Sequence, residues 1–284
     1  MALAVGTMSS KAASFIILGE HFWRGVLSIA VFLVFWEIGS RSQAWFGFAF
    51  PWVSQVPAPT AVLQEMFKLV QEPSFWNSAF LSTVRVFEGF FAAMLIGIPL
   101  GLAMAVSRTF YGITFPVFEV LRPIPPLAWV PASIIFWPTQ ELSIAFVTFL
   151  GAFFTIVINV IGGAQAIDVR YFQAARSMGS STWDIFCRII LPGTLPSIVV
   201  GATVGVGITW AVVVAAEMIS GGGSAGSVGG AAGGGLGFFI WNSYVGGSYT
   251  QIVAGMISIG IAGYISSAAL RKIGRWMTPW LSEN

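Results

Sequence analysis

The stretch that decides the fold runs from Gln173 to Pro192 and reads QAARSMGSSTWDIFCRIILP. It lies between two long apolar segments, 142–163 and 194–218. Each segment is long enough to cross the hydrocarbon of a bilayer, which takes roughly 20 mainly apolar residues in a helix. The stretch therefore lies at a membrane surface, where short helices have nothing to span and are free to dock on a soluble partner.

The composition agrees with this reading. Apolar residues make up 56% of the 284 positions and charged residues only 8%, which argues against a soluble domain. Long apolar runs such as 142–161 lack the two-residue alternation of a barrel strand, so the spans are expected to be helices. The sequence predicts an all-α polytopic membrane protein, one domain over residues 1–284. Its spans, about six, are expected at 24–43, 81–106, 113–136, 142–163, 194–218 and 250–270.

Basic residues predict the orientation, because they are retained on the cytoplasmic side. The first apolar stretch, 26–36, shows no cleavage pattern and is expected to remain as a span. An even number of spans puts both termini on one side. If that side is the cytoplasm, only Arg41 and Lys68 fall outside, and nine basic residues fall inside: Lys11, Arg24, Arg108, Arg170, Arg176, Arg188, Arg271, Lys272 and Arg275. The stretch 173–192 is then cytoplasmic.

Local signals inside the stretch predict two short helices joined by a turn. Asp168 suits the amino end of the first helix, and Ala174 and Ala175 keep that helix slim enough to enter a partner's groove. Gly179 permits a sharp turn that a residue with a β-carbon resists.

The second helix is expected to begin near Ser181, with Asp184 three residues later approximating a capping box. Pro192 suits the entry to the next span, because a missing amide is tolerated at a helix start. Such a bent helical pair, anchored at both ends in the bilayer, is what a mechanical coupler needs. A loop that merely joins two spans is the alternative.

The stretch resembles the "EAA" loop of bacterial ABC importer permeases, whose pattern is Glu-Ala-Ala, three residues, Gly, nine residues, Ile-x-Leu-Pro. Every spacing matches, and only the leading Glu is replaced, by Gln173. Three further segments resemble the subfamily that imports nitrate, sulfonates, taurine or bicarbonate: Pro57-Ala58-Pro59, Leu121 to Pro131, and Ala215-Ala216-Glu217-Met218-Ile219. The sequence of residues 237–241 is most similar to the nitrate and bicarbonate branch of this subfamily.

The resemblance implies a type I ABC importer permease in a bacterial inner membrane. It implies a coupling loop over about 164–192 that docks on an ATPase subunit, a second permease copy in a homodimer, and an external substrate-binding protein. ATP and Mg²⁺ would bind to the ATPase, since this chain has no Gly-x4-Gly-Lys-Ser/Thr phosphate loop and carries no cofactor of its own. The residues assigned to coupling are Gln173, Ala174, Ala175, Arg176, Met178, Gly179, Ile189, Leu191 and Pro192.

Ionisable residues inside spans need a partner or a water-filled path, because each costs at least roughly 2.5 kcal/mol at the bilayer centre. Arg85 and Glu88 are three residues apart, which predicts a structural pair. Glu119 and Arg122 have the same spacing.

Prolines at 123, 125 and 126 follow this second pair and must interrupt the helix, as at many transport paths. Arg122 and Pro123 are therefore candidates for the translocation path, with Arg122 attracting an anion. A buried pair with Glu119 that fixes the kink is the alternative. Glu217, at the end of the fifth predicted span, is a further candidate, for gating or for helix packing.

Glycines serve two predicted roles. Residues 220–237 hold ten glycines and no charge, which favours a flexible external loop over an anion-binding nest. This run is longer than the subfamily pattern implies. Small residues in the spans permit close helix packing: Gly97, Gly101, Gly201, Gly205 and Gly207.

Other function classes fit the sequence less well. A gradient-driven secondary transporter or channel would be favoured by an internal repeat or a series of acidic relay residues, and neither is present. The single Cys187 and single His21 provide neither a disulfide nor a metal cluster, and no catalytic constellation supports an enzyme. The net charge of +2 reflects the cytoplasmic loops, so nucleic-acid binding is not expected.

Overall fold

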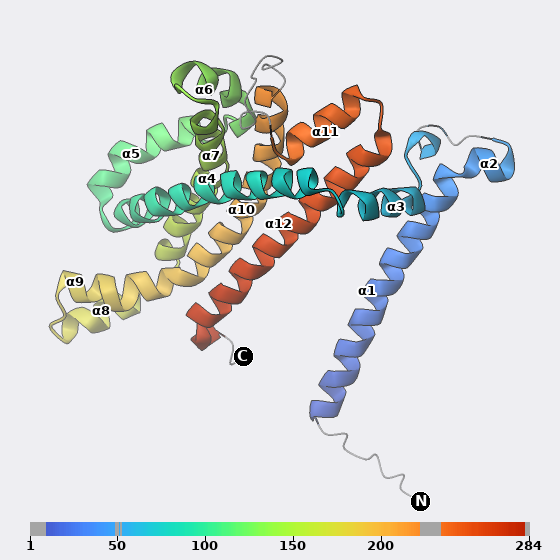
Figure 1. Ribbon diagram of the computed structural model, residues 1–284. Helices are drawn as coiled ribbons and strands as arrows, with labels where there is room; N and C mark the ends of the chain where they lie inside the picture. The colour runs from blue at the N-terminus through green and yellow to red at the C-terminus, as the bar shows by residue number, and fades with distance from the viewer. Residues whose placement is uncertain (1–9, 49–50, 52, 222–233, 282–284) are drawn as a thin grey trace, which may run out of the picture.

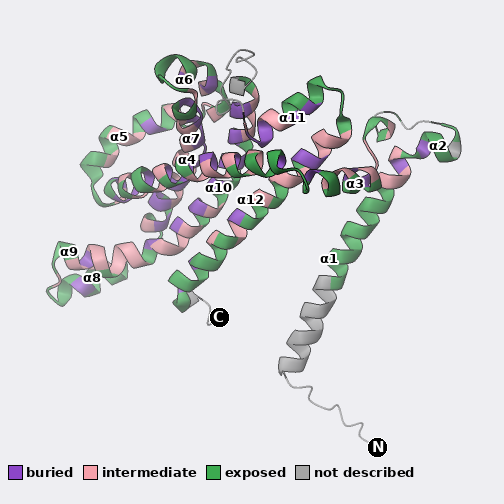
Figure 2. Ribbon diagram, in the orientation of Figure 1, coloured by how far each residue is buried: buried purple, intermediate pink, exposed green. Residues whose placement is uncertain are grey.

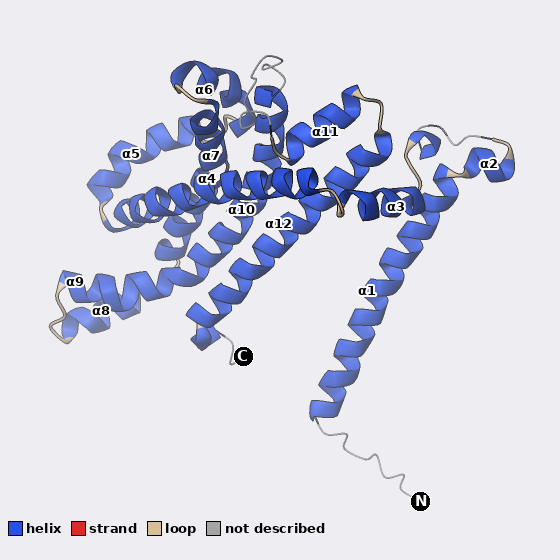
Figure 3. Cartoon of the chain, viewed as in Figure 1, coloured by secondary structure: helices blue, strands red, loops and turns tan. Residues whose placement is uncertain are grey.

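The computed structural model describes residues 10–48, 51, 53–221 and 234–281. These residues form helices and turns, and no strand occurs among them (Figure 3). The long helices are α1 (Ser10–Ser40), α4 (Pro73–Val106), α7 (Gln140–Gln165), α10 (Leu191–Gly221) and α12 (Tyr249–Met277). The shorter α-helices are α2 (Ser42–Phe46), α3 (Pro59–Leu69), α5 (Arg108–Leu121), α6 (Val130–Phe136), α8 (Val169–Ser177), α9 (Thr182–Ile185) and α11 (Leu236–Val245). The remaining elements are the 3₁₀ turns η1 (Val53–Gln55), η2 (Pro126–Trp129) and η4 (Pro279–Leu281), and the π-helical turn η3 (Phe186–Ile190).

Five helical stretches in the described residues are long and apolar enough to cross a membrane. They match five of the expected spans. The third expected span, 113–136, is interrupted at its prolines, as the sequence predicts, and none of its pieces alone is among the five long apolar helices. That segment consists of α5, a break at 122–125, η2 and the short apolar helix α6. The cause is the run of prolines, because each removes an amide hydrogen and its ring displaces the preceding turn.

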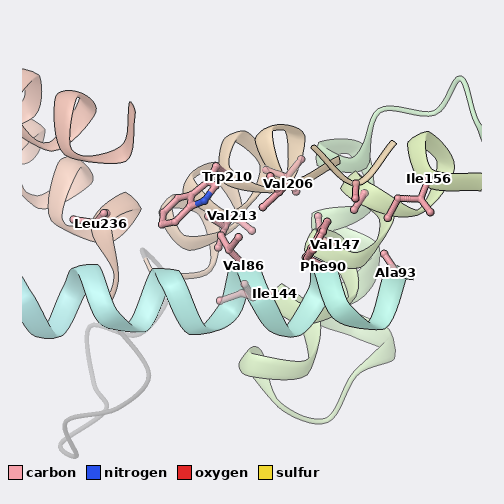
Figure 4. Close-up of a cluster of buried hydrophobic side chains, with 14 of the residues drawn as sticks. Val86, Phe90, Ala93, Ile144, Val147, Ile156, Val206, Trp210, Val213 and Leu236 are labelled. Atoms are coloured by element: carbon pink, nitrogen blue, oxygen red, sulfur yellow. The ribbon is translucent and has the colours of Figure 1, made fainter. Parts of the chain in front are cut away.

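The core of the bundle forms where α7 packs along both α4 and α10. Figure 4 shows its buried side chains converging from three directions. They include Val86, Phe90 and Ala93 of α4, Ile144, Val147 and Ile156 of α7, and Val206, Trp210 and Val213 of α10. Lipid tails are as apolar as these side chains, so close van der Waals packing has to hold the helices together.

Glycines permit this close packing, as the sequence predicts. A β-carbon at Gly97, Gly101, Gly201 or Gly205 would meet atoms of α7 within 4 Å. Gly207 differs, since a β-carbon added there would meet nothing within 4 Å. The closest approach is at Gly89 of α4, where an added β-carbon would lie 2.2 Å from Thr148 Oγ1 and 2.7 Å from the Phe149 amide nitrogen.

The two ends of the bundle carry different structures (Figure 1). The helices α6 and α11 lie at the top of this view, whereas α8, α9 and the carboxyl end of α12 lie at the bottom left. The helix α1 stands apart from the bundle at the right, and its side chains from Trp23 to Phe35 are exposed (Figure 2). Its carboxyl end is tied to α3, because Glu37 accepts hydrogen bonds from the Thr60 amide at 3.1 Å and hydroxyl at 2.9 Å.

The close approach at Gly89 generates a prediction for stability. Gly89→Ala is expected to lower the stability of the purified full-length chain by about 1–3 kcal/mol, the usual cost of overpacking. The measurement is the midpoint of thermal unfolding in detergent. Gly112→Ala is the matched control, since that helical glycine has nothing within 4 Å. Equal midpoints for the two variants would contradict the tight α4–α7 crossing.

Candidate functional site

The helices α8 and α9 form a bent pair at the lower end of the bundle (Figure 1). Asp168 caps α8, accepting a hydrogen bond from the Arg170 amide at 2.8 Å. The Arg170 side chain and amide both donate to this carboxylate and lower the pKa of Asp168. At the other end the Gly179 amide donates to Arg176 O and the Ser180 amide to Ala175 O, which is the Schellman arrangement. Gly179 has a φ of +79°, so the turn needs a left-handed residue at this position.

The second helix begins as predicted at Ser181. Ser181 Oγ accepts from the Asp184 amide at 3.1 Å, and the Asp184 carboxylate accepts from the Ser181 amide at 3.2 Å. Both halves of the capping box are therefore present with Asp as the partner. The amino end of α9 is fixed by local hydrogen bonds alone.

The helix α9 does not stop before the fifth predicted span. It passes through η3 into α10, and Thr182–Ile219 forms one continuous apolar stretch. The Leu191 amide bonds back to Phe186 O, five residues earlier, just before Pro192. Pro192 has no amide hydrogen and therefore cannot donate a backbone hydrogen bond to the preceding turn. The π-turn lies directly before Pro192, and its wider turn accommodates the missing hydrogen bond. The expected separate second helix is thus one arm of a long helix.

Side chains on the bent pair differ in their accessibility (Figure 2). Gln173, Ala174, Arg176, Met178 and Gly179 are exposed, Ile189, Leu191 and Pro192 are half-buried, and Ala175 is buried. Ala175 thus packs inside this chain, and of the two alanines only Ala174 is free to face a partner. Met178 and Trp183 are 79% and 71% exposed, which makes them the large apolar side chains at the tip.

A charge cluster lies at the opposite end of α10, and we define it as the buried Ser82, Arg85 and Glu217 together with the half-exposed Glu141. Arg85 Nη1 donates to Glu217 Oε1 at 2.9 Å, and the two side chains are 2% and 0% exposed. Ser82 Oγ donates to the Glu217 carboxylate at 2.8 Å. The Gly237 amide donates to Glu217 Oε2 at 2.9 Å, so the carboxylate also holds the start of α11.

Glu141 at the start of α7 completes the cluster. Its two carboxylate oxygens accept from Arg85 Nε, at 2.8 Å, and from Arg85 Nη2. The predicted pair of Arg85 with Glu88 is wrong, since Glu88 is exposed and Arg85 is bonded to the two other carboxylates. One guanidinium therefore joins α4, α7 and α10.

The candidate path residues lie in two places. Glu217 is inside the charge cluster. Arg122 and Glu119 form the predicted pair, with an N···O distance of 3.8 Å, and their side chains are 45% and 52% exposed. The pair is not buried within the chain, and Pro123 beside it is also exposed. The break after Arg122 therefore presents this cation on the surface of the single chain.

Sequence reasoning missed Ser82 and Glu141. The available signal was weak: Glu141 is an acidic residue in the first turn of a predicted span, a position that helices favour for their own dipole. Among the described residues no group of three or more His, Cys, Asp or Glu side chains could hold a metal ion.

Comparisons with known proteins agree with this architecture. Residues 97–283 match the family model described as binding-protein-dependent transport system inner membrane component. The chain is 35% identical to the nitrate import permease protein NrtB of Synechocystis sp., over 85% of this chain and 84% of the relative. It is 31% identical to the taurine transport system permease protein TauC of Escherichia coli, over 80% of this chain and 81% of the relative. It is 28% identical to the bicarbonate transport system permease protein CmpB of Synechococcus elongatus, over 89% of this chain and 87% of the relative.

Solved structures support the fold. The inward-facing MetNI methionine ABC transporter contains a chain with a TM-score of 0.61 and 21% identity, covering 73% of this chain and 99% of that one. A chain of a bacterial ABC transporter involved in the import of the acidic polysaccharide alginate has a TM-score of 0.54 and 14% identity. The match covers 92% of this chain and 99% of that one. The chain is a multi-pass permease with the type I ABC importer fold. It belongs to the binding-protein-dependent transport system inner membrane component family, in the group that contains the nitrate, taurine and bicarbonate permeases.

The buried pair generates a second prediction. Glu217→Gln is expected to destabilise the full-length chain by about 1–3 kcal/mol, because the buried donors of Arg85, Ser82 and Gly237 lose a charged acceptor while Arg85 keeps its pair with Glu141. Glu119→Gln, at an exposed pair, is expected to change stability by less than about 1 kcal/mol. Thermal unfolding midpoints in detergent compare the two. Similar small shifts would mean that the Glu217 pair does not hold the helices together.

Proposed function

We propose that the chain is the permease subunit of an ATP-driven importer for a small anion, with nitrate or bicarbonate ahead of sulfonate or taurine. The identities of 35%, 31% and 28% to nitrate, taurine and bicarbonate permeases support the general class, and the order within it rests on the segment 237–241 alone. The observation that carries the coupling mechanism is the helical run from Thr182 through Gly221. A helix rises 1.5 Å per residue, so about 40 Å of this helix separates Leu191 from Glu217. A force applied to one end of the helix is therefore transmitted to the other end.

The bent pair α8–α9 is the proposed docking element for a separate ATPase subunit. Exposed Met178 and Trp183 at the tip would insert into an apolar cleft of that subunit. Arg176 and Arg188 are exposed near them and would face acidic groups at its rim. ATP and Mg²⁺ would bind in the ATPase, and this chain would carry no cofactor.

Two copies of the chain would surround one path, with an external binding protein delivering the anion. Both termini and the α8–α9 pair would be cytoplasmic, as the distribution of basic residues favours. Glu119, Arg122 and Pro123 would line the path, with Arg122 attracting the anion. Glu217 would hold the outer ends of the helices in register. Alternating access would be a rocking of the two halves as the ATPase pair closes.

Uptake by a reconstituted transporter tests this function. The permease, its ATPase and its binding protein would be placed in proteoliposomes, and uptake of nitrate, bicarbonate and taurine would be measured with and without ATP. The expected result is uptake of at least one of these anions that requires ATP. Uptake driven by a proton or sodium gradient without ATP would overturn the proposal in favour of a secondary transporter.

The turn at Gly179 provides a sharper test of coupling. Gly179→Val is expected to abolish most ATP-driven uptake while the subunit still inserts in the membrane, because a β-branched side chain opposes a φ of +79°. Gly162→Val is the matched control, since this nearby helical glycine has nothing within 4 Å and no positive φ. Uptake is compared at equal permease content. Normal uptake by the Gly179 variant would count against coupling through the turn.

A further inference from the structure

The guanidinium of Arg85 has two hydrogen-bonding edges, and each edge has different acceptors in the fold. Nη1 donates to Glu217 Oε1 at 2.9 Å and to Gly234 O at 2.6 Å, both supplied by the α10–α11 region. The Nε–Nη2 edge is occupied by the two oxygens of Glu141 alone. A guanidinium edge of this kind binds a planar oxyanion through two parallel hydrogen bonds.

Glu141 is the accessible member of the cluster. Its side chain is 49% exposed, against 2% for Arg85 and 0% for Glu217. The residue follows Thr139, which caps α7, and so lies in the first helical turn, where free amides and the helix dipole attract negative charge. The Glu141 carboxylate therefore lies at the surface of the single chain.

Release of Glu141 from Arg85 leaves no bare charge behind. Glu217 and Gly234 O continue to hold Nη1, so Arg85 remains paired with one carboxylate. With Glu141 bound the three charges sum to −1, and with Glu141 swung away from the edge the remaining pair is neutral. An anion that takes its place restores the same hydrogen bonds and the same charge.

We propose that the Nε–Nη2 edge of Arg85 is a binding site for a planar oxyanion, and that the Glu141 carboxylate occupies it as an internal substitute in this conformation. The O–C–O unit of a carboxylate has the planar, two-oxygen geometry of nitrate and bicarbonate. Exchange of Glu141 for the anion would free the start of α7 from α4. The assignment of nitrate and bicarbonate as physiological ligands rests on the proposed function, whereas the site itself rests on the geometry of Arg85.

Removal of the internal carboxylate tests the site without transport. The full-length chain is purified in detergent as wild type, Glu141→Gln and Glu141→Ala. Sodium nitrate is added at rising concentration, with sodium chloride at equal ionic strength as the comparison. Both variants are expected to show a saturable rise of the thermal unfolding midpoint with nitrate, because a ligand that binds only the folded state stabilises it. The half-effect concentration is expected to be at least about tenfold lower than for wild type, since no carboxylate competes for the edge.

Two controls separate binding at this edge from general salt effects. Glu88→Gln removes an exposed carboxylate from the same helix and is expected to behave as wild type, since Arg85 is bonded to Glu141 and Glu217 instead. Combining Arg85→Lys with Glu141→Gln is expected to abolish the nitrate effect, since an ammonium cannot present the planar two-donor edge. A chloride response equal to that of nitrate would overturn the proposal. The proposal would also be overturned if the Glu141 variants unfold and nitrate does not restore their stability. Glu141 would then have a purely structural role.

Failure of this site is distinguishable from failure of the proposed function. ATP-driven anion uptake by the wild-type assembly, without nitrate rescue of the Glu141 variants, would leave the importer intact and remove the site. Nitrate binding by the variants without any anion uptake would leave the site intact and remove the substrate assignment.

Discussion

A charge inside a bilayer has to be paired where it lies, and the pairing of Arg85 organises the end of this bundle opposite α8–α9. Its guanidinium is 2% exposed and bonds to carboxylates from two other helices, Glu141 of α7 and Glu217 of α10. Apolar contacts alone do not specify how these helices align, because lipid competes equally for their side chains. The hydrogen bonds of Glu217 to Ser82 and to the Gly237 amide extend the same constraint to the start of α11.

The charge cluster and the bent pair α8–α9 lie at opposite ends of one long helix. The π-turn at η3 keeps this helix continuous past Pro192 and so joins the membrane surface to the interior of the bundle. Tight contacts of α7 with α4 and α10 mean that the long helix cannot shift without its neighbours. A movement imposed on α8–α9 is therefore expected to reach the cluster as a movement of packed helices.

The sequence predicted the parts of this architecture that depend on local chemistry. The turn at Gly179 and the cap at Ser181 each involve residues within five positions of one another, so their spacing was sufficient. The break in the third span also follows from local chemistry, because the prolines at 123, 125 and 126 interrupt the helix. The partner of Arg85 was assigned to Glu88 by proximity along the helix, whereas the true partners are 56 and 132 residues away. Only the packing of three helices brings them together, and no local pattern encodes it.

The central claim is that the α8–α9 tip docks on an ATPase in the cytoplasm. The most direct measurement uses the full-length chain with Cys187→Ser and Met178→Cys, labelled by a membrane-impermeant thiol reagent. We predict labelling in inside-out vesicles, none in sealed right-side-out vesicles, and protection from labelling when the ATPase subunit is bound. Labelling from the outside, or labelling that the bound ATPase leaves unchanged, would contradict it.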